Sequence, residues 1–184
     1  MPVLTWILIA LPIIIILWVV ISYNSLIKLR NDSEEAFSTI DVFLKKRFDL
    51  IPNLVETVKG YAKHEKTTLE NITNARAIGI KASSAEEKIS ADNMLTGALK
   101  SLFALSEAYP DLKANSNFKE LQQQLEKVEE DIANSRRYFN AVVKSYNIKT
   151  EVFPSSLIAS LFHFTRKPLY IIGEEQRDNV KIQF

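Results

Sequence analysis

The chain has 184 residues, with 23 basic and 22 acidic side chains and a formal net charge of +1 at pH 7. This balance gives no excess charge that would attract nucleic acid or an anionic substrate, so no nucleic-acid partner is expected. Cysteine is absent, which excludes disulfides, thiolate metal sites, cysteine nucleophiles and lipid-modified cysteine. The four glycines are few for a turn-rich β protein and are typical of long helices.

Residues 3–21 form an uncharged apolar run, VLTWILIALPIIIILWVVI. As a helix that rises about 1.5 Å per residue, the run matches the roughly 30 Å of a bilayer's hydrocarbon core, and a membrane span tolerates its proline. No Lys or Arg precedes the run and no small-residue cleavage site follows it, which disfavours a cleaved signal peptide. We expect a retained transmembrane helix within residues 1–23. The span is expected to contain Val3, Trp6, Pro12, Trp18 and Ile21.

Basic residues follow the apolar run but do not precede it. Lys28, Arg30, Lys45, Lys46 and Arg47 lie within about 25 residues of its end. Segments rich in Lys and Arg stay on the cytoplasmic side of a membrane. The sequence therefore predicts a single-pass protein with its N-terminus outside and its C-terminal domain in the cytoplasm.

The helix is expected to continue beyond the membrane through residues 24–48, which contain neither Pro nor Gly. Pro52 lacks a backbone donor and clashes with the preceding turn, so we predict a kink or a restart of the helix there. Arg47, Asp49 and Asn53 flank Pro52. These residues are expected either to cap backbone groups that the kink frees or to form a polar contact site, and capping is favoured.

A second helix is predicted after Pro52, and a third after the next turn. Apolar spacing extends the second helix to about residue 77, and Gly79 and the polar run at residues 81–84 are expected to mark the turn. Ser84 and Glu87 have the spacing of a capping box, in which each side chain satisfies a backbone donor of the other residue. The third helix is therefore expected to begin after Ser84.

The clearest periodicity in the chain covers residues 118–146. Apolar positions recur three and four residues apart at Phe118, Leu121, Leu125, Val128, Ile132, Ser135, Phe139, Val142 and Tyr146. This spacing predicts a long helix that packs against others at about 20°, as in a bundle or coiled coil. Asn117 and Glu120 form a weaker cap-like pair at its start.

The pattern changes after residue 151. Residues 152–156 predict a turn. A short amphipathic helix is then expected, with Leu157, Ile158, Leu161 and Phe162 on its apolar face. Two cations, Arg166 and Lys167, follow the helix. This helix either docks on the bundle or lies in the membrane interface with the cations at the headgroups. Residues 169–184 predict an extended tail.

Together these elements predict an all-α protein. A transmembrane helix continues into an antiparallel bundle of three to four long helices, followed by the short amphipathic helix and the extended tail. The expected boundaries are residues 1–23 for the N-terminal tail and span, 24–150 for the bundle and 151–184 for the C-terminal part. No internal repeat or low-complexity segment interrupts this organisation.

No constellation of residues indicates catalysis. His64 and Glu65 begin like the H-E-x-x-H zinc motif, but position 68 is Thr and the other histidine, His163, is distant. We therefore predict no catalytic, cofactor-binding or metal-binding residue, and the protein is not expected to be an enzyme. Four charged residues on or beside apolar faces are expected to form buried ion pairs that fix helix register: Asp41, Glu65, Arg76 and Arg136.

Three stretches of the chain resemble the LemA family. The first contains YNSLIKLRN at 23–31, AFSTIDVFLKKRFDLIPNLV at 36–55 and VKGYAKHE at 58–65. The second is EAYPDLKANSNF at 107–118, and the third combines RRYFNAVVKSYN at 136–147 with FPSSLI at 153–158. The resemblance implies a bacterial membrane protein with a short N-terminal tail, one span and a helical-bundle domain. It implies little about activity, because the family as a whole has no established enzymatic function.

Two functions from different classes follow. The favoured hypothesis is a non-enzymatic scaffold or adaptor of the bacterial cytoplasmic membrane that forms a homo-oligomer or assembles with membrane proteins. The alternative, implied by the resemblance, is a regulator or cofactor of an HtpX-type membrane metalloprotease in envelope stress or membrane protein quality control. A hydrolase that acts through Asp41, Asp49 or His64 is the least favoured hypothesis. The lipid bilayer is the expected partner, and no cofactor is expected.

Overall fold

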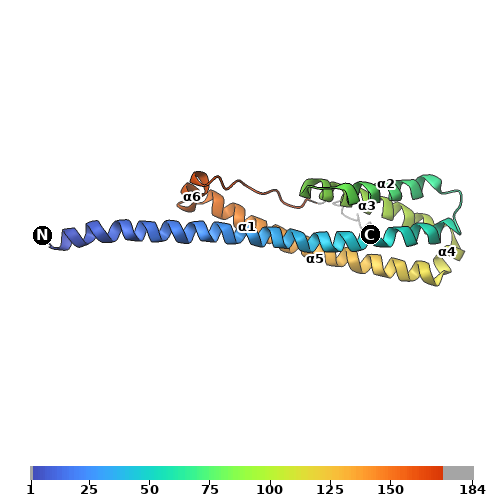
Figure 1. The fold of residues 1–184 in the computed structure, drawn as a ribbon. Helices are drawn as coiled ribbons and strands as arrows, with labels where there is room; N and C mark the ends of the chain where they lie inside the picture. The colour runs from blue at the N-terminus through green and yellow to red at the C-terminus, as the bar shows by residue number, and fades with distance from the viewer. Residues whose placement is uncertain (1, 172–184) are drawn as a thin grey trace, which may run out of the picture. The chain divides into compact units, whose positions relative to one another are not determined.

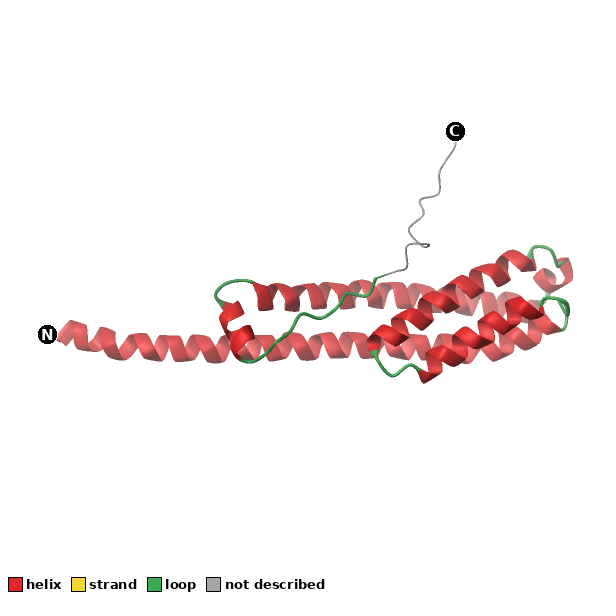
Figure 2. Ribbon diagram, turned by 90° about the horizontal axis from the view of Figure 1, so that it is seen from above, coloured by secondary structure: helices red, strands yellow, loops and turns green. Residues whose placement is uncertain are grey.

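The computed structural model describes residues 2–171, with the backbone alone for residues 2–5. Within these residues it contains six helices and no strand (Figures 1 and 2). The helices are α1 (Pro2–Lys59), α2 (Lys66–Lys81), α3 (Ala85–Ser106), α4 (Pro110–Ala114), α5 (Ser116–Glu151) and α6 (Ser155–Leu161). The predicted all-α fold, with its long apolar helix at the start of the chain, is confirmed. Most of the predicted extended tail, from residue 172 on, lies outside the described residues.

The chain divides into two compact units. Of the described residues, 2–38 and 137–169 form the first unit, and 39–136 and 170–171 form the second. Each unit therefore combines segments that are far apart in the sequence, and both α1 and α5 contribute to both units. The domain boundaries expected after residues 23 and 150 stay predictions.

The start of α1 exposes its apolar side chains. Trp6 is 73% exposed, Ile14 is 61% exposed and Ile21 is 66% exposed. Among the described residues, α1 is the one helix long and apolar enough to cross a membrane. Exposing so many contiguous apolar side chains to water is strongly unfavourable. This part of α1 therefore requires an apolar environment that the other residues described by the structure do not provide.

Segments of α1, α2, α3 and α5 build the core of the second unit. Each contributes one apolar face with three- and four-residue spacing, as predicted. The most deeply buried of these residues are Ile40, Leu44, Leu54, Val58, Ile72, Leu95, Leu102, Phe118 and Ile132. The rings of Phe103 and Phe118 pack edge to face with centroids 6.3 Å apart, which joins α3 to α5. The predicted helical bundle is thus present.

The helix α1 continues through Pro52 to Lys59, so of the predicted kink or restart the restart is wrong, and the kink stays a prediction. The break lies instead at residues 60–65, before α2. Proline at this position removes the amide donor for the carbonyl four residues earlier, that of Phe48. Arg76 of α2 supplies a replacement, because its Nε donates to the Phe48 carbonyl oxygen at 2.8 Å. The helix passes through Pro52 while a side chain from another helix satisfies the freed carbonyl.

The residues that flank Pro52 make other contacts. Asp49 pairs with Lys45 Nζ at 2.9 Å on an exposed face of α1. Asn53 is exposed, and its backbone carbonyl accepts a hydrogen bond from Thr57 Oγ1. Arg47 is buried in the ion cluster described below. The capping role expected of these neighbours falls to a residue of α2 because the freed carbonyl faces that helix.

Gly79 lies inside α2, which extends to Lys81, and not in the predicted turn. The residue is buried, and a Cβ atom added to it would overlap the ring of Phe48. Gly79 therefore permits the close approach of α2 to the turn of α1 that precedes Pro52. The turn between α2 and α3 falls at residues 82–84.

Two helices of the second unit begin with a side-chain cap. At α3 the predicted capping box is confirmed: Glu87 N donates to Ser84 Oγ at 3.1 Å, and Ser84 N donates to Glu87 Oε2 at 3.2 Å. At α5 the cap is Asn115, whose Oδ1 accepts a hydrogen bond from Phe118 N at 2.9 Å. The predicted cap at Asn117 is wrong, because α5 begins one residue earlier.

Two positions of the inward face of α5 differ from the prediction by one residue, while Phe139 and Tyr146 are buried as predicted. Ile132 is buried as predicted, but Arg136 is buried where Ser135 was expected, and Val143 is buried where Val142 was expected. Arg136 follows Ile132 by four residues, and Val143 follows Phe139 by four. Each therefore lies about 40° from that buried residue, on the same face of the helix.

The hydrogen bond from Arg76 to the Phe48 carbonyl predicts an energetic coupling between Arg76 and Pro52. Arg76→Met should lower the free energy of unfolding by about 1–3 kcal/mol, because it leaves the Phe48 carbonyl without a donor. In a Pro52→Ala background the backbone N–H at position 52 can donate instead, so the same change should cost clearly less. Denaturant unfolding of the full-length protein in detergent, followed by circular dichroism, measures the cycle. Equal costs in the two backgrounds would contradict this account.

Candidate functional site

Five side chains from distant parts of the chain meet inside the second unit, and we name them the Asp92 cluster: Arg47, Asp92, Glu129, Arg136 and Tyr170. The Asp92 side chain of α3 is fully buried. Its Oδ1 accepts a hydrogen bond from Arg47 Nη1 at 2.7 Å. Its Oδ2 accepts from Tyr170 Oη at 2.8 Å and from Arg136 Nη2. The carboxylate thus has partners from two other helices and from the segment after α6.

Glu129 of α5 completes the cluster at its more exposed side. Its side chain is 39% exposed, and its Oε2 lies 3.0 Å from Arg47 Nη1. A longer contact of 3.9 Å joins Glu129 Oε1 to Arg136 Nη1. The Arg136 guanidinium carbon also lies 4.8 Å from the centre of the Tyr170 ring, within the range of cation–π attraction. Two arginines therefore face two carboxylates, and their formal charges cancel.

The environment keeps the arginine and the tyrosine in their protonated forms. Burial opposes the charge of Arg136, but the Asp92 carboxylate, together with Tyr170 and Glu129, outweighs burial and raises the pKa of the guanidinium. Burial, and next the Asp92 carboxylate, raise the pKa of Tyr170 far above its ordinary value. Tyr170 therefore stays a neutral hydroxyl that donates to Asp92. Neither Arg136 nor Tyr170 therefore exchanges a proton near neutral pH.

Sequence analysis places Arg136 beside an apolar face but does not single out Asp92. The available signal is a charged residue at apolar-face spacing: Asp92 lies three positions after Ile89 and three before Leu95. Tyr170 carries no comparable signal, because it follows α6 in an irregular segment and reaches the cluster only in the folded chain. A buried acid can be inferred from periodicity, but its partners cannot.

The other charged residues that we expected in buried ion pairs have more exposed or different partners. Asp41 Oδ1 lies 2.6 Å from Lys88 Nζ, but the Asp41 side chain is 46% exposed. Glu65 Oε1 accepts a hydrogen bond from Tyr109 Oη at 2.9 Å, which raises the pKa of Tyr109. Arg76 binds a backbone carbonyl. Of the four predicted residues, Arg136 is the one that these contacts place in a buried ion pair.

The described residues contain no arrangement that points to metal chemistry. Nowhere in this part of the chain do three or more His, Asp or Glu side chains gather closely enough to hold a metal ion. A groove of about 430 Å³ beside the Asp92 cluster is lined in part by Arg47, Thr96 and Glu129. Its lining includes no histidine and no pair of a nucleophile with an adjacent base. The groove offers polar atoms without a reactive group.

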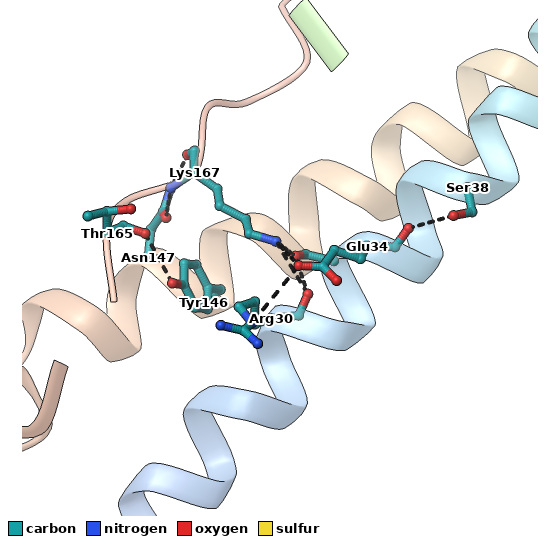
Figure 3. Close-up of polar contacts among 8 residues, drawn as sticks. Arg30, Glu34, Ser38, Tyr146, Asn147, Thr165 and Lys167 are labelled. Carbon is teal, nitrogen blue, oxygen red and sulfur yellow. Dashed lines mark hydrogen bonds and ion pairs between the residues drawn. The ribbon is translucent and has the colours of Figure 1, made fainter. Parts of the chain in front are cut away.

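In the first unit, the segment after α6 is tied to α5 and α1 by polar contacts (Figure 3). Asn147 of α5 holds the backbone of Lys167 at both ends: Nδ2 donates to the Lys167 carbonyl, and Oδ1 accepts from the Lys167 amide, each at 2.9 Å. Tyr146 Oη donates to the carbonyl of Thr165 at 3.0 Å. Lys167 Nζ then donates to Ser33 Oγ at 2.7 Å and pairs with Glu34 Oε1 at 3.2 Å.

The residues predicted at the membrane interface fall into two groups. Ile158 is 4% exposed and packs on α1, whereas Leu157 is 60% exposed and Leu161 is 67% exposed. Phe162 is 46% exposed, and the Arg166 side chain is 69% exposed. Lys167 forms the contacts given above. The short helix therefore docks on α1 with one face and exposes the opposite face, and the expected contact with the membrane interface stays a prediction.

The residues predicted in the membrane span lie along the first part of α1. Trp6, Pro12 and Ile21 are exposed, and Trp18 is half-buried against α6. The side chain of Val3 lies outside the described part of the structure. None of these residues takes part in the Asp92 cluster, so the apolar helix and the charged core are separate features of the molecule.

Comparison with known proteins agrees with the motifs in the sequence. The LemA family model matches residues 36–184, which include both the Asp92 cluster and α6. The chain belongs to the LemA family. Protein LemA of Metamycoplasma hominis is 27% identical over 161 residues, which cover 85% of this chain and 72% of that protein.

Two magnetosome proteins are also similar to this LemA-family chain. Magnetosome protein MamQ 2 of Paramagnetospirillum magneticum is 25% identical over 170 residues, and magnetosome protein MamQ of Magnetospirillum gryphiswaldense is 24% identical over 170 residues. Each match covers 78% of this chain but 62% of the magnetosome protein, less than two thirds of its length. The apolar helix and these relatives together indicate a membrane-associated protein.

Loss of the Asp92 carboxylate should destabilise the protein strongly. Asp92→Ala leaves two buried arginines without their shared partner, so we expect the free energy of unfolding to fall by about 3–5 kcal/mol. The matched control is Asp49→Ala, which removes the exposed pair with Lys45 and should change stability by no more than about 1 kcal/mol. Denaturant unfolding of both full-length variants in detergent checks the comparison. A similar effect of the two substitutions would show that the Asp92 cluster is not an energetic constraint.

Proposed function

We propose that this protein is a non-enzymatic scaffold or adaptor, anchored in the bacterial cytoplasmic membrane by the start of α1. The observation that carries the proposal is the continuity of α1. One uninterrupted helix contains both the exposed apolar run around Trp6 to Ile21 and the buried core positions Ile40 and Val58 of the second unit. An anchor and a folded interaction domain are thereby joined without a flexible linker in the chain between them.

The use of the charged residues supports a structural function over a catalytic one. Asp92 accepts hydrogen bonds from three side chains and has no access to solvent, so it is not available to a substrate. Arg47 and Arg136 are occupied by Asp92 and Glu129. A general acid or base needs both access and a pKa near the working pH. Asp92 is buried without access to solvent, and the pKa values of Arg136 and Tyr170 are raised further from neutrality.

Exposed apolar side chains on the second unit support assembly with proteins. Val42 of α1 is 56% exposed, Ile80 of α2 is 55% exposed and Met94 of α3 is 49% exposed. Covering apolar surface contributes about 25 cal/mol per Å² removed from water. We propose that these residues take part in contacts with further copies of the chain, in a homo-oligomer, or with membrane proteins.

Site-specific crosslinking tests the scaffold proposal. A photo-crosslinking residue introduced at Ile80 or at Val42 of the full-length protein in cells should capture a second copy or a membrane protein. The control is the same residue at Lys127, an exposed polar position of α5, which should capture little. If Ile80 and Val42 capture nothing and the purified protein is strictly monomeric in lipid nanodiscs, the proposal fails. Capture of a membrane metalloprotease would instead favour the alternative function as its regulator.

We also propose a single-pass topology with the N-terminus outside and the helical domain in the cytoplasm. The support is the charge asymmetry around the span, because Lys28 and Arg30 follow it closely. The absence of native cysteine makes an engineered one specific. Tyr138→Cys, at a position that is 62% exposed, should react with a membrane-impermeant maleimide only after permeabilisation of the cells. Ile132→Cys, at a fully buried position, controls for accessibility, and labelling of Tyr138→Cys in intact cells would reverse the topology.

A further inference from the structure

One face of α6 packs against α1 where the apolar run ends. Ile158 and Ala159 are 4% and 2% exposed, and they form a small core with Leu26 of α1. The residues packed around this core are Trp18, Val19, Tyr23 and Phe164. The uncharged apolar run ends at Ile21. The short helix therefore lies beside the last turn of the apolar run and the first polar turn that follows it.

The opposite face of α6 and the turn before it are apolar and uncovered. Phe153 is 80% exposed, Leu157 is 60% exposed and Leu161 is 67% exposed. Val152 and Phe162 are each 46% exposed. Leu157 and Leu161 are four residues apart, so they share one side of the helix. We name these five residues the α6 apolar face.

Aromatic rings and cations border this face. Tyr23 of α1 packs against Phe162 and Phe164, with ring centroids 4.7 Å and 5.8 Å apart. The Arg30 guanidinium lies 6.0 Å from the centre of the Phe164 ring, and the Arg166 side chain is 69% exposed and pairs with Glu151 Oε1 at 3.3 Å. Aromatic side chains concentrate at the headgroup level of membranes, and Lys and Arg there attract anionic lipids.

The end of α6 fixes the position of these aromatic rings. His163 has a left-handed backbone conformation with φ of 57°. His163 N donates to the Ser160 carbonyl at 3.3 Å, and Phe164 N donates to the Ala159 carbonyl at 2.9 Å. These two bonds form a Schellman motif, which reverses the chain direction at a helix end. The reversal brings Phe164 back onto Tyr23, so that α6 is held on α1 at both its core and its end.

We propose that the α6 apolar face inserts into the lipid interface beside the span, as a second membrane contact of this protein. The proposal rests on α1 crossing the bilayer. Because α6 packs beside the end of the apolar run of α1, it then lies at the level where hydrocarbon gives way to headgroups. An apolar face bordered by cations is typical of an interfacial helix. Lipid is the occupant because the exposed residues continue the lipid-facing surface of α1. The span and the α6 apolar face together fix the depth and the rotation of α1 in the bilayer. A uniformly apolar helix cannot fix them alone.

Site-specific fluorescence in a bilayer tests this contact. Leu161→Cys and Phe153→Cys of the full-length protein carry an environment-sensitive nitrobenzoxadiazole dye in nanodiscs of phosphatidylcholine and phosphatidylglycerol. Ile13→Cys in the apolar run reports whether the span itself is inserted. Tyr138→Cys is the aqueous control, because it lies about 20 Å along α5 from the end of that helix. Lipids with a nitroxide quencher near the headgroup or near the methyl end of the chain report the depth of each dye.

Dyes at Leu161 and Phe153 should emit at shorter wavelength than the dye at Tyr138 and lose intensity to the headgroup-level quencher more than to the deep one. A water-like emission at both positions, with the dye at Ile13 quenched, would overturn the contact while leaving the span intact. A blue-shifted dye that no lipid quencher reaches would assign the face to a second copy of the chain and also overturn the proposal. Loss of quenching at Ile13 would instead refute the anchor on which the proposal rests.

Discussion

The buried carboxylate of Asp92 is the constraint on which the second unit depends. A carboxylate removed from water must be paired, and its partners come from α1, α5 and the segment after α6 through Arg47, Arg136 and Tyr170. Such an ion cluster adds little net stability compared with apolar packing, but an arrangement that leaves one charge unpaired is heavily penalised. We infer that the cluster selects a single register of the helices, because sliding any one helix along the others would leave a buried charge without a partner.

The same logic applies to the backbone. Arg76 satisfies the carbonyl that Pro52 leaves without a donor, and Gly79, one turn further along α2, makes room for the ring of Phe48. In the first unit, the Asn147 side chain hydrogen-bonds both the carbonyl and the amide of Lys167, as a neighbouring strand would in a β-sheet. Buried polar groups of the main chain must find a partner. In both units, side chains from another helix meet this requirement where regular secondary structure does not.

These features divide the protein into parts with different tasks. The start of α1 is apolar and exposed, which suits a membrane, while the charged residues of the second unit serve its internal packing. Membership of the LemA family and the similarity to magnetosome proteins agree with membrane association. The buried charges serve the packing of the second unit, and the exposed surface is apolar in places, which supports the scaffold function proposed above.

The sequence by itself determined the helical class, the apolar helix, the capping box and most inward-facing residues, because these depend on local spacing and on residue chemistry. It located the charged residues Arg136 and Arg76 beside apolar faces but not their partners. Only the tertiary structure decided that α1 passes through Pro52, that Asn115 caps α5 and that Asp92 collects partners from remote segments. It also decided that α6 docks with Ile158 and leaves Leu157 and Leu161 uncovered. Periodicity defines a face of a helix, but which neighbour that face meets depends on contacts between residues far apart in the chain.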